Sequence, residues 1–413
     1  MALRRLQLQI PRFSTDKKLF LVGLMIFFFV VFDGILMYLA PIIITGAGIS
    51  ASVMGLIIGS SSVAGLLFDL FLCRAFKDTN YRRMFLLMLL MATLYPLFLF
   101  GGTTITFYLV AMAVWGFYYD FYNIGTLDFV GRTTEPSRHA SSFGVLRIFE
   151  GSGYLLAPLV ASILLLYLHP GPRMLLALAV PLVISFCIYI LVIFRNVGEK
   201  DQFERVERAD ALSFFEEMHL WKMLAKMLLP ILLLTLTINV IDAAICTFGP
   251  LFSEQIGTSM GISGGAFMAS YALPPLLVGW IVGVIARRLG MRRTAQGAIA
   301  LGSLFLISIG FVTAPVLLIA LVFIASFFLA IGWPSLNAIY TEQVNKTPEH
   351  SKEIETLQDL FTNFGDIAGP IAGGYMAEYL GFAGSFVALG VLGVLTALML
   401  VLATAHDNIQ QTK

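Results

Sequence analysis

A series of long apolar runs, separated by short polar segments, limits how this chain can fold more than any other feature. A helix that crosses a bilayer needs about 20 predominantly apolar residues. The runs that are long enough number twelve and cover residues 19–45, 51–73, 84–101, 104–130, 139–168, 173–195, 224–253, 261–286, 294–312, 315–341, 352–380 and 382–404. Only 12% of the 413 residues are charged, whereas a soluble domain carries about 25%. The sequence therefore predicts an all-α integral membrane protein with twelve transmembrane helices.

Basic residues are concentrated at the N-terminus and in alternate connections between the runs. They are Arg4, Arg5, Arg12, Lys17, Lys18, Arg74, Lys77, Arg82, Arg83, Arg132, Arg138, Arg287, Arg288, Arg292, Arg293, Lys346 and Lys352. The six short connections that alternate with these hold one basic residue between them, Arg173. Since short cytoplasmic loops are rich in Lys and Arg, we expect the basic loops and both termini to be cytoplasmic, in a multi-pass protein of the plasma (inner) membrane. The first run is too long for a signal peptide, so we interpret it as the first span.

The one long connection divides the chain into two groups of six runs. It extends from Arg195 to Lys222 and is rich in charged residues. We therefore expect an N-terminal six-helix bundle at residues 1–195, a cytoplasmic linker at 196–222 and a C-terminal six-helix bundle at 223–413. Ser213 and Glu216 have the spacing of a capping box, which predicts a short interfacial helix at the end of the linker.

The two groups of runs repeat each other. The equivalent pairs are Asp33 and Asp242, Pro41 and Pro250, Pro136 and Pro348, and Pro158 and Pro370. The offset is 209 residues for the first two pairs and 212 residues for the last two. Such an internal duplication predicts two bundles related by pseudo-symmetry.

A pattern of glycine and proline occurs in the fifth and eleventh runs. The complete copy, in the eleventh run, consists of Gly365, Gly369, Pro370, Gly373 and Gly374. The partial copy in the fifth run keeps Gly153 and Pro158. Small residues at these spacings let helix backbones approach closely. We expect both segments to pack tightly and to permit one half of the protein to rock on the other.

A second pattern lies in the basic loops. After the second run, Gly65 and Asp69 are followed, beyond an insertion, by Arg82 and Arg83. The corresponding residues after the eighth run are Gly283, Arg288, Gly290, Arg292 and Arg293, with Arg287 in place of the acid. Both loops are similar to the G-x-x-x-D-[RK]-x-G-[RK]-[RK] signature of the major facilitator superfamily. The eleventh run is similar to that superfamily's G-x-x-x-G-P-x-x-G-G segment, which is associated with antiporters when it lies in the fifth helix.

With its twelve runs, its duplication and its charged central linker, nearly the whole chain resembles the major facilitator superfamily. The resemblance implies two six-helix bundles around a central cavity, lined by helices 1, 4, 7 and 10. Substrate would bind near the midplane, and the halves would rock to expose it alternately. By the same resemblance, a cytoplasmic network would hold one conformation; its members would be Asp69, Asp128, Arg82, Arg83, Arg132 and Arg138.

Charged residues inside the apolar runs are the candidates for transport chemistry. They include Asp33, Asp120, Asp242, Arg147 and Glu150. An ionised aspartate at the centre of a membrane helix costs about 2.5–3.5 kcal/mol. A membrane carboxyl can carry a proton between the two faces or pair with a cationic substrate. The alternatives are structural: each aspartate braces a neighbouring helix, and Arg147 pairs with Glu150 three residues later.

Polar and aromatic residues on the presumed cavity helices complete the candidate site. We expect Tyr38, Tyr119, Asn123, Trp333 and Asn337 to line the cavity. Aromatic faces attract cations, although an aromatic stripe more often serves packing. Arg147 is the one basic residue well inside a span, so an anionic substrate would bind there.

Several classes of function are excluded by what the sequence lacks. It has no phosphate-binding Gly-x-x-x-x-Gly-Lys-Ser/Thr loop, and its five histidines and three cysteines form no metal-ligand pattern. The net charge of +1 suggests no nucleic-acid partner. We therefore expect no enzyme activity, no cofactor and no metal. The expected partners are a small-molecule substrate, protons and membrane lipids, with the protein acting as a monomer.

These observations favour a secondary active transporter that works by alternating access. The first hypothesis is proton-coupled export of a hydrophobic or cationic compound. The second is a proton-coupled importer, or a facilitator, of a polar or anionic nutrient. The third is a non-transporting membrane receptor or assembly factor with the same fold.

Overall fold

The computed structural model describes residues 17–68, 80–194, 214–260 and 264–411. In these residues all regular secondary structure is helical. The first half contains α1 (Lys17–Gly46), α2 (Ala51–Leu67), α3 (Tyr81–Gly101), α4 (Ile105–Thr133), α5 (His139–Tyr167) and α6 (Pro172–Tyr189). The second half contains α7 (Phe214–Met260), α8 (Ala266–Ala272), α9 (Pro274–Leu289), α10 (Met291–Ile309), α11 (Pro315–Lys346), α12 (Ser351–Tyr379) and α13 (Gly381–Gln411). Each of the twelve predicted spans coincides with one of these helices or with a consecutive pair.

Apolar length differs among the helices. Seven of the described helices are long and apolar enough to cross a membrane, and the segment from Ala266 to Leu289, which bends between Gly279 and Ile281, makes an eighth if it is one span. The helices outside this group are α2, α4, α10 and α12. α2 has only 17 residues, and α12 carries Asp359 and Asp366 within its length. The all-α, multi-pass membrane fold predicted from the apolar runs is confirmed.

Proline explains one departure from the predicted spans. The eighth span was expected as a single helix, but it is divided into α8 and α9 at Leu273. Pro274 and Pro275 follow this residue, and a proline lacks the N–H that would continue the hydrogen-bond ladder of α8. Both prolines fit the first turn of α9, where a missing N–H has no consequence.

A second departure concerns the end of the linker. The predicted interfacial helix is not a separate element, because α7 runs without a break from Phe214 to Met260. No glycine or proline occurs between Phe214 and Leu229 to end a helix there. Residues 195–213, including Ser213 of the predicted capping box, lie outside the described residues.

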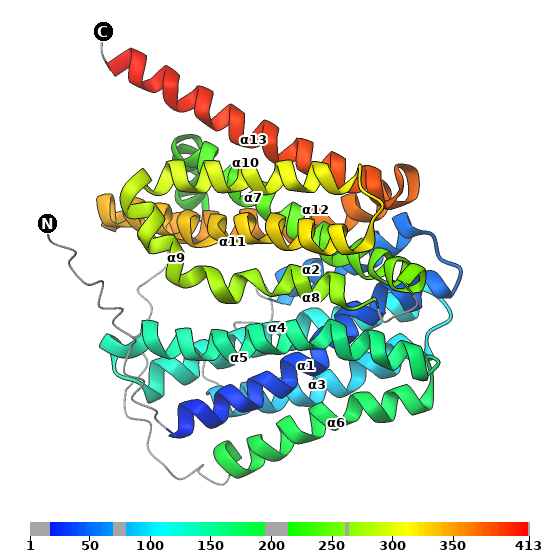
Figure 1. The fold of residues 1–413 in the computed structure, drawn as a ribbon. Coiled ribbons are helices and arrows are strands. Elements are labelled where there is room, and N and C mark those ends of the chain that lie inside the picture. The colour runs from blue at the N-terminus through cyan, green and yellow to red at the C-terminus, as the bar shows by residue number, and fades with distance from the viewer. Residues whose placement is uncertain (1–16, 69–79, 195–213, 261–263, 412–413) are drawn as a thin grey trace, which may run out of the picture.

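The helices form two bundles with matching internal contacts. Figure 1 shows the N-terminal bundle below the C-terminal bundle, with α13 rising away from the latter toward the C-terminus. In the first bundle α1 packs against α5 and α3 against α4. In the second bundle α7 packs against α12 and α10 against α11, which are the equivalent pairs under the sequence repeat. The 3₁₀ turns Pro136–Arg138 and Pro348–His350 also precede α5 and α12 at equivalent places.

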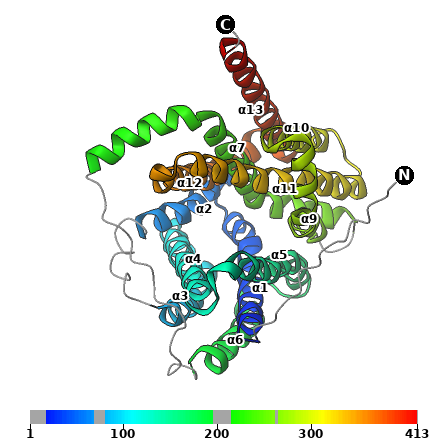
Figure 2. The same cartoon turned by 90° about the vertical axis from the view of Figure 1, so that its left-hand side faces the viewer.

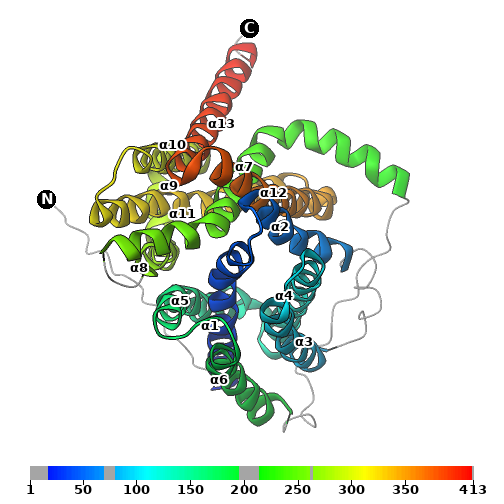
Figure 3. The same ribbon diagram turned by 90° about the vertical axis from the view of Figure 1, so that its right-hand side faces the viewer.

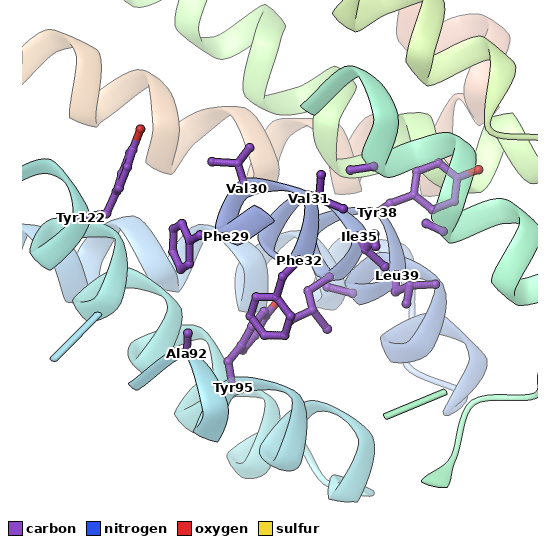
Figure 4. Close-up of a cluster of buried hydrophobic side chains, with 14 of the residues drawn as sticks. Phe29, Val30, Val31, Phe32, Ile35, Tyr38, Leu39, Ala92, Tyr95 and Tyr122 are labelled. Carbon is purple, nitrogen blue, oxygen red and sulfur yellow. The ribbon is translucent and has the colours of Figure 1, made fainter. Parts of the chain in front are cut away.

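The core of the first bundle is centred on α1. Its buried side chains point in several directions around the helix, as expected for a helix that is enclosed by others. Figure 4 shows Phe29 and Phe32 of α1 on the side of Ala92 and Tyr95 of α3. All four of these side chains are buried in one continuous apolar cluster.

The two bundles meet mainly through three pairs of helices. α2 packs against α12, α5 against α8, and α1 against α7; Figure 2 shows α2 beside α12, and Figure 3 shows α8 beside α5. Along the part of the chain that is described, α4 and α11 have no comparable contact. The halves therefore meet through a limited set of helices, and α4 and α11 are left apart.

Candidate functional site

Asp33 is enclosed within the first bundle. Its side chain is 1% exposed. One carboxylate oxygen, Oδ1, accepts hydrogen bonds from Trp115 Nε1 at 3.0 Å and from the Tyr118 hydroxyl at 2.5 Å. The other, Oδ2, accepts from the Tyr154 hydroxyl at 3.0 Å. Among the described residues Asp33 has no ion pair, so three neutral donors hold this carboxylate between α1, α4 and α5.

The donors of Asp33 were not singled out from the sequence. Trp115 and Tyr118 belong to the aromatic segment of α4 that surrounds Asp120, and Tyr154 lies one turn after Glu150 on α5. The tyrosine-rich composition of α4 was the available signal. A buried Tyr or Trp needs a partner for its polar atom, and Asp33 is an acceptor for three of them.

Asp242, the repeat-related residue, has a different environment. It accepts one hydrogen bond, from the Tyr271 hydroxyl at 2.5 Å, and is partly rather than fully buried. Its carboxyl is close enough to that of Asp366 on α12 to interact electrostatically. In the described part of the chain neither carboxyl has a basic partner. The two aspartates therefore form an acidic pair between α7 and α12.

Arg147 and Glu150 pair as the structural alternative predicted. Arg147 Nη1 donates to both carboxylate oxygens of Glu150, at 3.0 and 3.1 Å. The two side chains differ in exposure, which is 76% for Arg147 and 8% for Glu150. The guanidinium thus neutralises a buried carboxylate while most of its own surface stays open.

The other candidate site residues are dispersed. Asp120 lies at the contact between α4 and α2, where a β-carbon at Gly65 would be 3.1 Å from its Oδ2 atom. Tyr119 is partly buried, 5.8 Å from the ring of Tyr122, and Asn123 is exposed.

The predicted cavity residues outside α4 also lie apart. In α11, Trp333 packs on an apolar cluster of the second bundle. Asn337 accepts a hydrogen bond from Gln358 at 2.9 Å. Tyr38 is buried and donates to Glu254 of α7.

The glycine pattern of α12 faces two different neighbours. A β-carbon at Gly369 would lie 2.6 Å from that of Ala243, and one at Gly373 would lie 2.9 Å from the α-carbon of Ala244. Gly365 likewise packs on Asn239. These three glycines therefore bring α12 against α7 within one bundle.

The rest of the pattern contacts the opposite bundle. The Pro370 carbonyl and Gly374 pack on Gly55 of α2. The equivalent contact joins the Pro158 carbonyl of α5 to Gly265 before α8. Gly153, by contrast, packs on Phe27 and Val30 of α1, inside its own bundle. The two prolines thus mark equivalent points where the halves touch.

Two residues of the predicted cytoplasmic network, Asp128 and Arg132, pair with each other within α4. Asp128 accepts a hydrogen bond from the backbone N–H of Tyr81 at 2.7 Å and pairs with Arg132 at 2.9 Å. The Arg82 guanidinium lies 5.2 Å from the centre of the Tyr81 ring. Arg83 is exposed, and Asp69 lies outside the described residues. Asp128 thereby ties the start of α3 to the end of α4.

Known proteins support the fold. The sequence matches the family profile of the Major Facilitator Superfamily over residues 22–352 and again over residues 268–413. No curated protein matches it. Among solved structures, it is similar to a bacterial homologue of the human lysosomal transporter Spinster, in an inward-facing and unoccupied conformation, with a TM-score of 0.70 and 13% identity over 94% of this chain and 95% of that one.

Two further structures show the same likeness. The nucleoside transporter NupG has a TM-score of 0.73 and 15% identity, over 94% of this chain and 98% of that one. A peptide transporter, POT, in complex with sulfate has a TM-score of 0.70 and 13% identity, over 96% of both chains. The class expected from the sequence, a transporter and not an enzyme, follows from the family match, which covers more than half of the chain. This protein is a member of the major facilitator superfamily.

Proposed function

We propose that this member of the superfamily couples the export of a hydrophobic or cationic compound to the movement of protons. The observation that carries the proposal is an excess of acid in the middle of the helices. The carboxylates there include Asp33, Glu150, Asp242 and Asp366, and the one guanidinium is Arg147. Since Arg147 pairs with Glu150, three carboxylates are left without a basic partner in the described chain.

An unpaired charge within a bilayer is costly, and a proton or a cationic ligand would remove that cost. A proton-coupled exporter needs both, because it exchanges one for the other. The excess of acid therefore supports a cycle in which protons neutralise the carboxylates when substrate is absent. A cationic substrate would compete with these protons.

The hydrogen bonds suggest different roles for the acidic residues. Asp33 has both oxygens occupied by donors from α4 and α5. Among the described residues, Asp242 accepts only from Tyr271, and its carboxyl interacts electrostatically with that of Asp366. We infer that the Asp242 and Asp366 pair binds protons and substrate in turn. Asp33 would respond to this exchange through Tyr154, the one described donor to its Oδ2 atom.

A transport assay tests the proposal. A panel of organic cations would first be screened for thermal stabilisation of the purified protein, and a hit would then be followed in proteoliposomes with an imposed pH gradient. We expect the gradient to drive accumulation in the wild type and Asp242→Asn to abolish that accumulation while keeping exchange. Accumulation that is unaffected by collapsing the gradient would refute proton coupling.

A second candidate function rests on the exposure of Arg147. Only its Nη1 atom is engaged by Glu150, and the side chain is 76% exposed. The guanidinium could therefore anchor an anionic or polar nutrient in an importer or facilitator, and the similar structures include nucleoside and peptide transporters. Stabilisation by anionic compounds that disappears in Arg147→Gln would favour this reading over the cationic one.

A further inference from the structure

We propose that Glu254 and Glu378 form a two-point latch that holds the two halves together at the end opposite the basic loops. Both carboxylates belong to the second bundle, and both accept hydrogen bonds from the first. The proposal does not depend on the substrate or on proton coupling. It predicts that removing these bonds favours a conformation that is open at this end.

At the first point of the latch, Glu378 caps the N-terminus of a helix in the other half. Its Oε2 atom accepts the backbone N–H of Ser52, in the first turn of α2, at 2.7 Å. The N–H groups of a first helical turn have no partner within their own helix. Ser50 caps the N–H of Val53 from within the first bundle, at 3.4 Å, and Glu378 caps the N–H of Ser52. A carboxylate is also favoured there by the positive end of the helix dipole.

The register of α12 on α2 explains how Glu378 reaches this N–H group. Gly374 lies four residues before Glu378, and residues with this spacing share one face of a helix. Gly374 packs directly on the Ala51 carbonyl, and a β-carbon there would be 2.9 Å from the α-carbon of Gly55. Because neither glycine has a side chain, the backbones approach closely and Glu378 is placed over the start of α2.

Tyr38 and Glu254 form the second point. The Tyr38 hydroxyl of α1 donates to Glu254 Oε1 of α7 at 2.6 Å. Tyr38 is 2% exposed, so this bond is shielded from water. Figure 4 shows Tyr38 reaching away from the side of α1 on which Phe29 and Phe32 meet α3. The hydroxyl thus links the helices that begin the two repeats.

Both points lie at the same end of the bundles. Glu378 lies in the last turn of α12 and Ser52 in the first turn of α2, while Tyr38 and Glu254 lie about two turns before the ends of α1 and α7. The basic loops join the other ends of these helices. The helices α4 and α11 have no comparable contact with each other in the described chain. The two hydrogen bonds therefore add to the packing of α2 on α12 and hold this end closed.

Distances between spin labels would test the latch. Labels would be placed at Ala47 and Gln255, which are exposed positions on opposite halves near the latch, in a variant that lacks Cys73, Cys187 and Cys246. The test variants are Glu378→Ala, Tyr38→Phe and their combination. Matched controls are Glu355→Ala, an exposed glutamate at the other end of α12, and Tyr167→Phe, an exposed tyrosine at the end of α5.

In each single test variant, the population with a long (open) distance should rise relative to the population with a short (closed) distance by roughly three- to tenfold. This is the effect of losing one hydrogen bond of ordinary net strength. The combination should give about the product of the two changes, since the points share no atoms. Both controls should match the wild type. An unchanged distance distribution in the double variant, or an equal shift in the controls, would overturn the proposal. Glu378 is exposed, so we expect Glu378→Ala to fold. The distances in this single variant test the latch even if the variants at the buried Tyr38 do not fold.

Discussion

The enclosed carboxylate of Asp33 leads to a prediction about which substitutions the protein tolerates. In Asp33→Asn, the amide oxygen can still accept from Trp115 and Tyr118, and the amide nitrogen can donate to the Tyr154 hydroxyl, which can accept as well as donate. In Asp33→Leu, the three donors lose their acceptor inside the first bundle. We therefore expect Asn to preserve the fold and Leu, although it has the same branched skeleton and is more apolar, to destabilise it.

The size of the effect follows from the number of donors. Leaving one buried donor unsatisfied costs about 1–3 kcal/mol, so three donors correspond to roughly 3–9 kcal/mol. A whole domain is stable by about 5–15 kcal/mol, which means that Asp33→Leu removes a large share of the stability of the first bundle. Rearrangement of the two tyrosine hydroxyls toward other acceptors would bring the loss toward the lower figure.

Thermal unfolding of the purified variants in one detergent would measure the difference. The expected order of midpoint temperatures is wild type, then Asp33→Asn, then Asp33→Leu at a clearly lower value with reduced yield. Val31→Leu, at a buried apolar position two residues earlier, controls for adding a leucine to the same core. If Asp33→Leu is as stable as Asp33→Asn, the three hydrogen bonds do not hold α1, α4 and α5 together.

Three other predictions follow from the contacts. Gly369→Leu should lower the yield of monodisperse protein because its side chain would separate α12 from α7, whereas Gly374→Leu should remain folded and lengthen the distance between labels on the two halves; equal yields would refute this division. Arg147→Gln should reduce the midpoint of thermal unfolding more than Glu150→Gln, because it leaves a buried carboxylate unpaired, a situation that costs up to about 3–5 kcal/mol. A cysteine at Ala47 should react with a membrane-impermeant reagent in whole cells and one at Gln202 should not; the reverse result would invert the predicted topology.

The fold was predictable from the sequence because its strongest signals are periodic and local. Apolar length located the helices of the fold, seven or eight of which are long and apolar enough to cross a membrane among the described residues, and the repeated Asp and Pro residues indicated two related bundles. The division of the eighth span could also have been found, since Pro274 and Pro275 are adjacent in the sequence. What the sequence does not state is which neighbour a residue faces. The glycines of α12 share one pattern, yet Gly369 contacts α7 and Gly374 contacts α2.

The candidate site was less predictable because its partners come from distant segments. Tyr118 and Tyr154 lie 85 and 121 residues after Asp33, so no local spacing relates them. Glu378 and Ser52 are 326 residues apart. The pairing of Arg147 with Glu150, by contrast, spans three residues of one helix and was foreseen.

The repeat itself yields one further distinction. Asp33 and Asp242 occupy equivalent places in the two halves, and from the sequence they are interchangeable candidates. The structure surrounds Asp33 with donors from α4 and α5, whereas in the described part of the chain Asp242 has a single donor, from α8. The helices equivalent to α4 and α5 are α11 and α12, and α12 brings another carboxylate, that of Asp366, toward Asp242. A group whose acceptor positions are filled is suited to holding helices together, and one with open positions beside a second acid is suited to exchanging a cation. The two halves therefore share a backbone frame but surround their aspartates differently, and this difference is the basis of the separate roles proposed for Asp33 and Asp242.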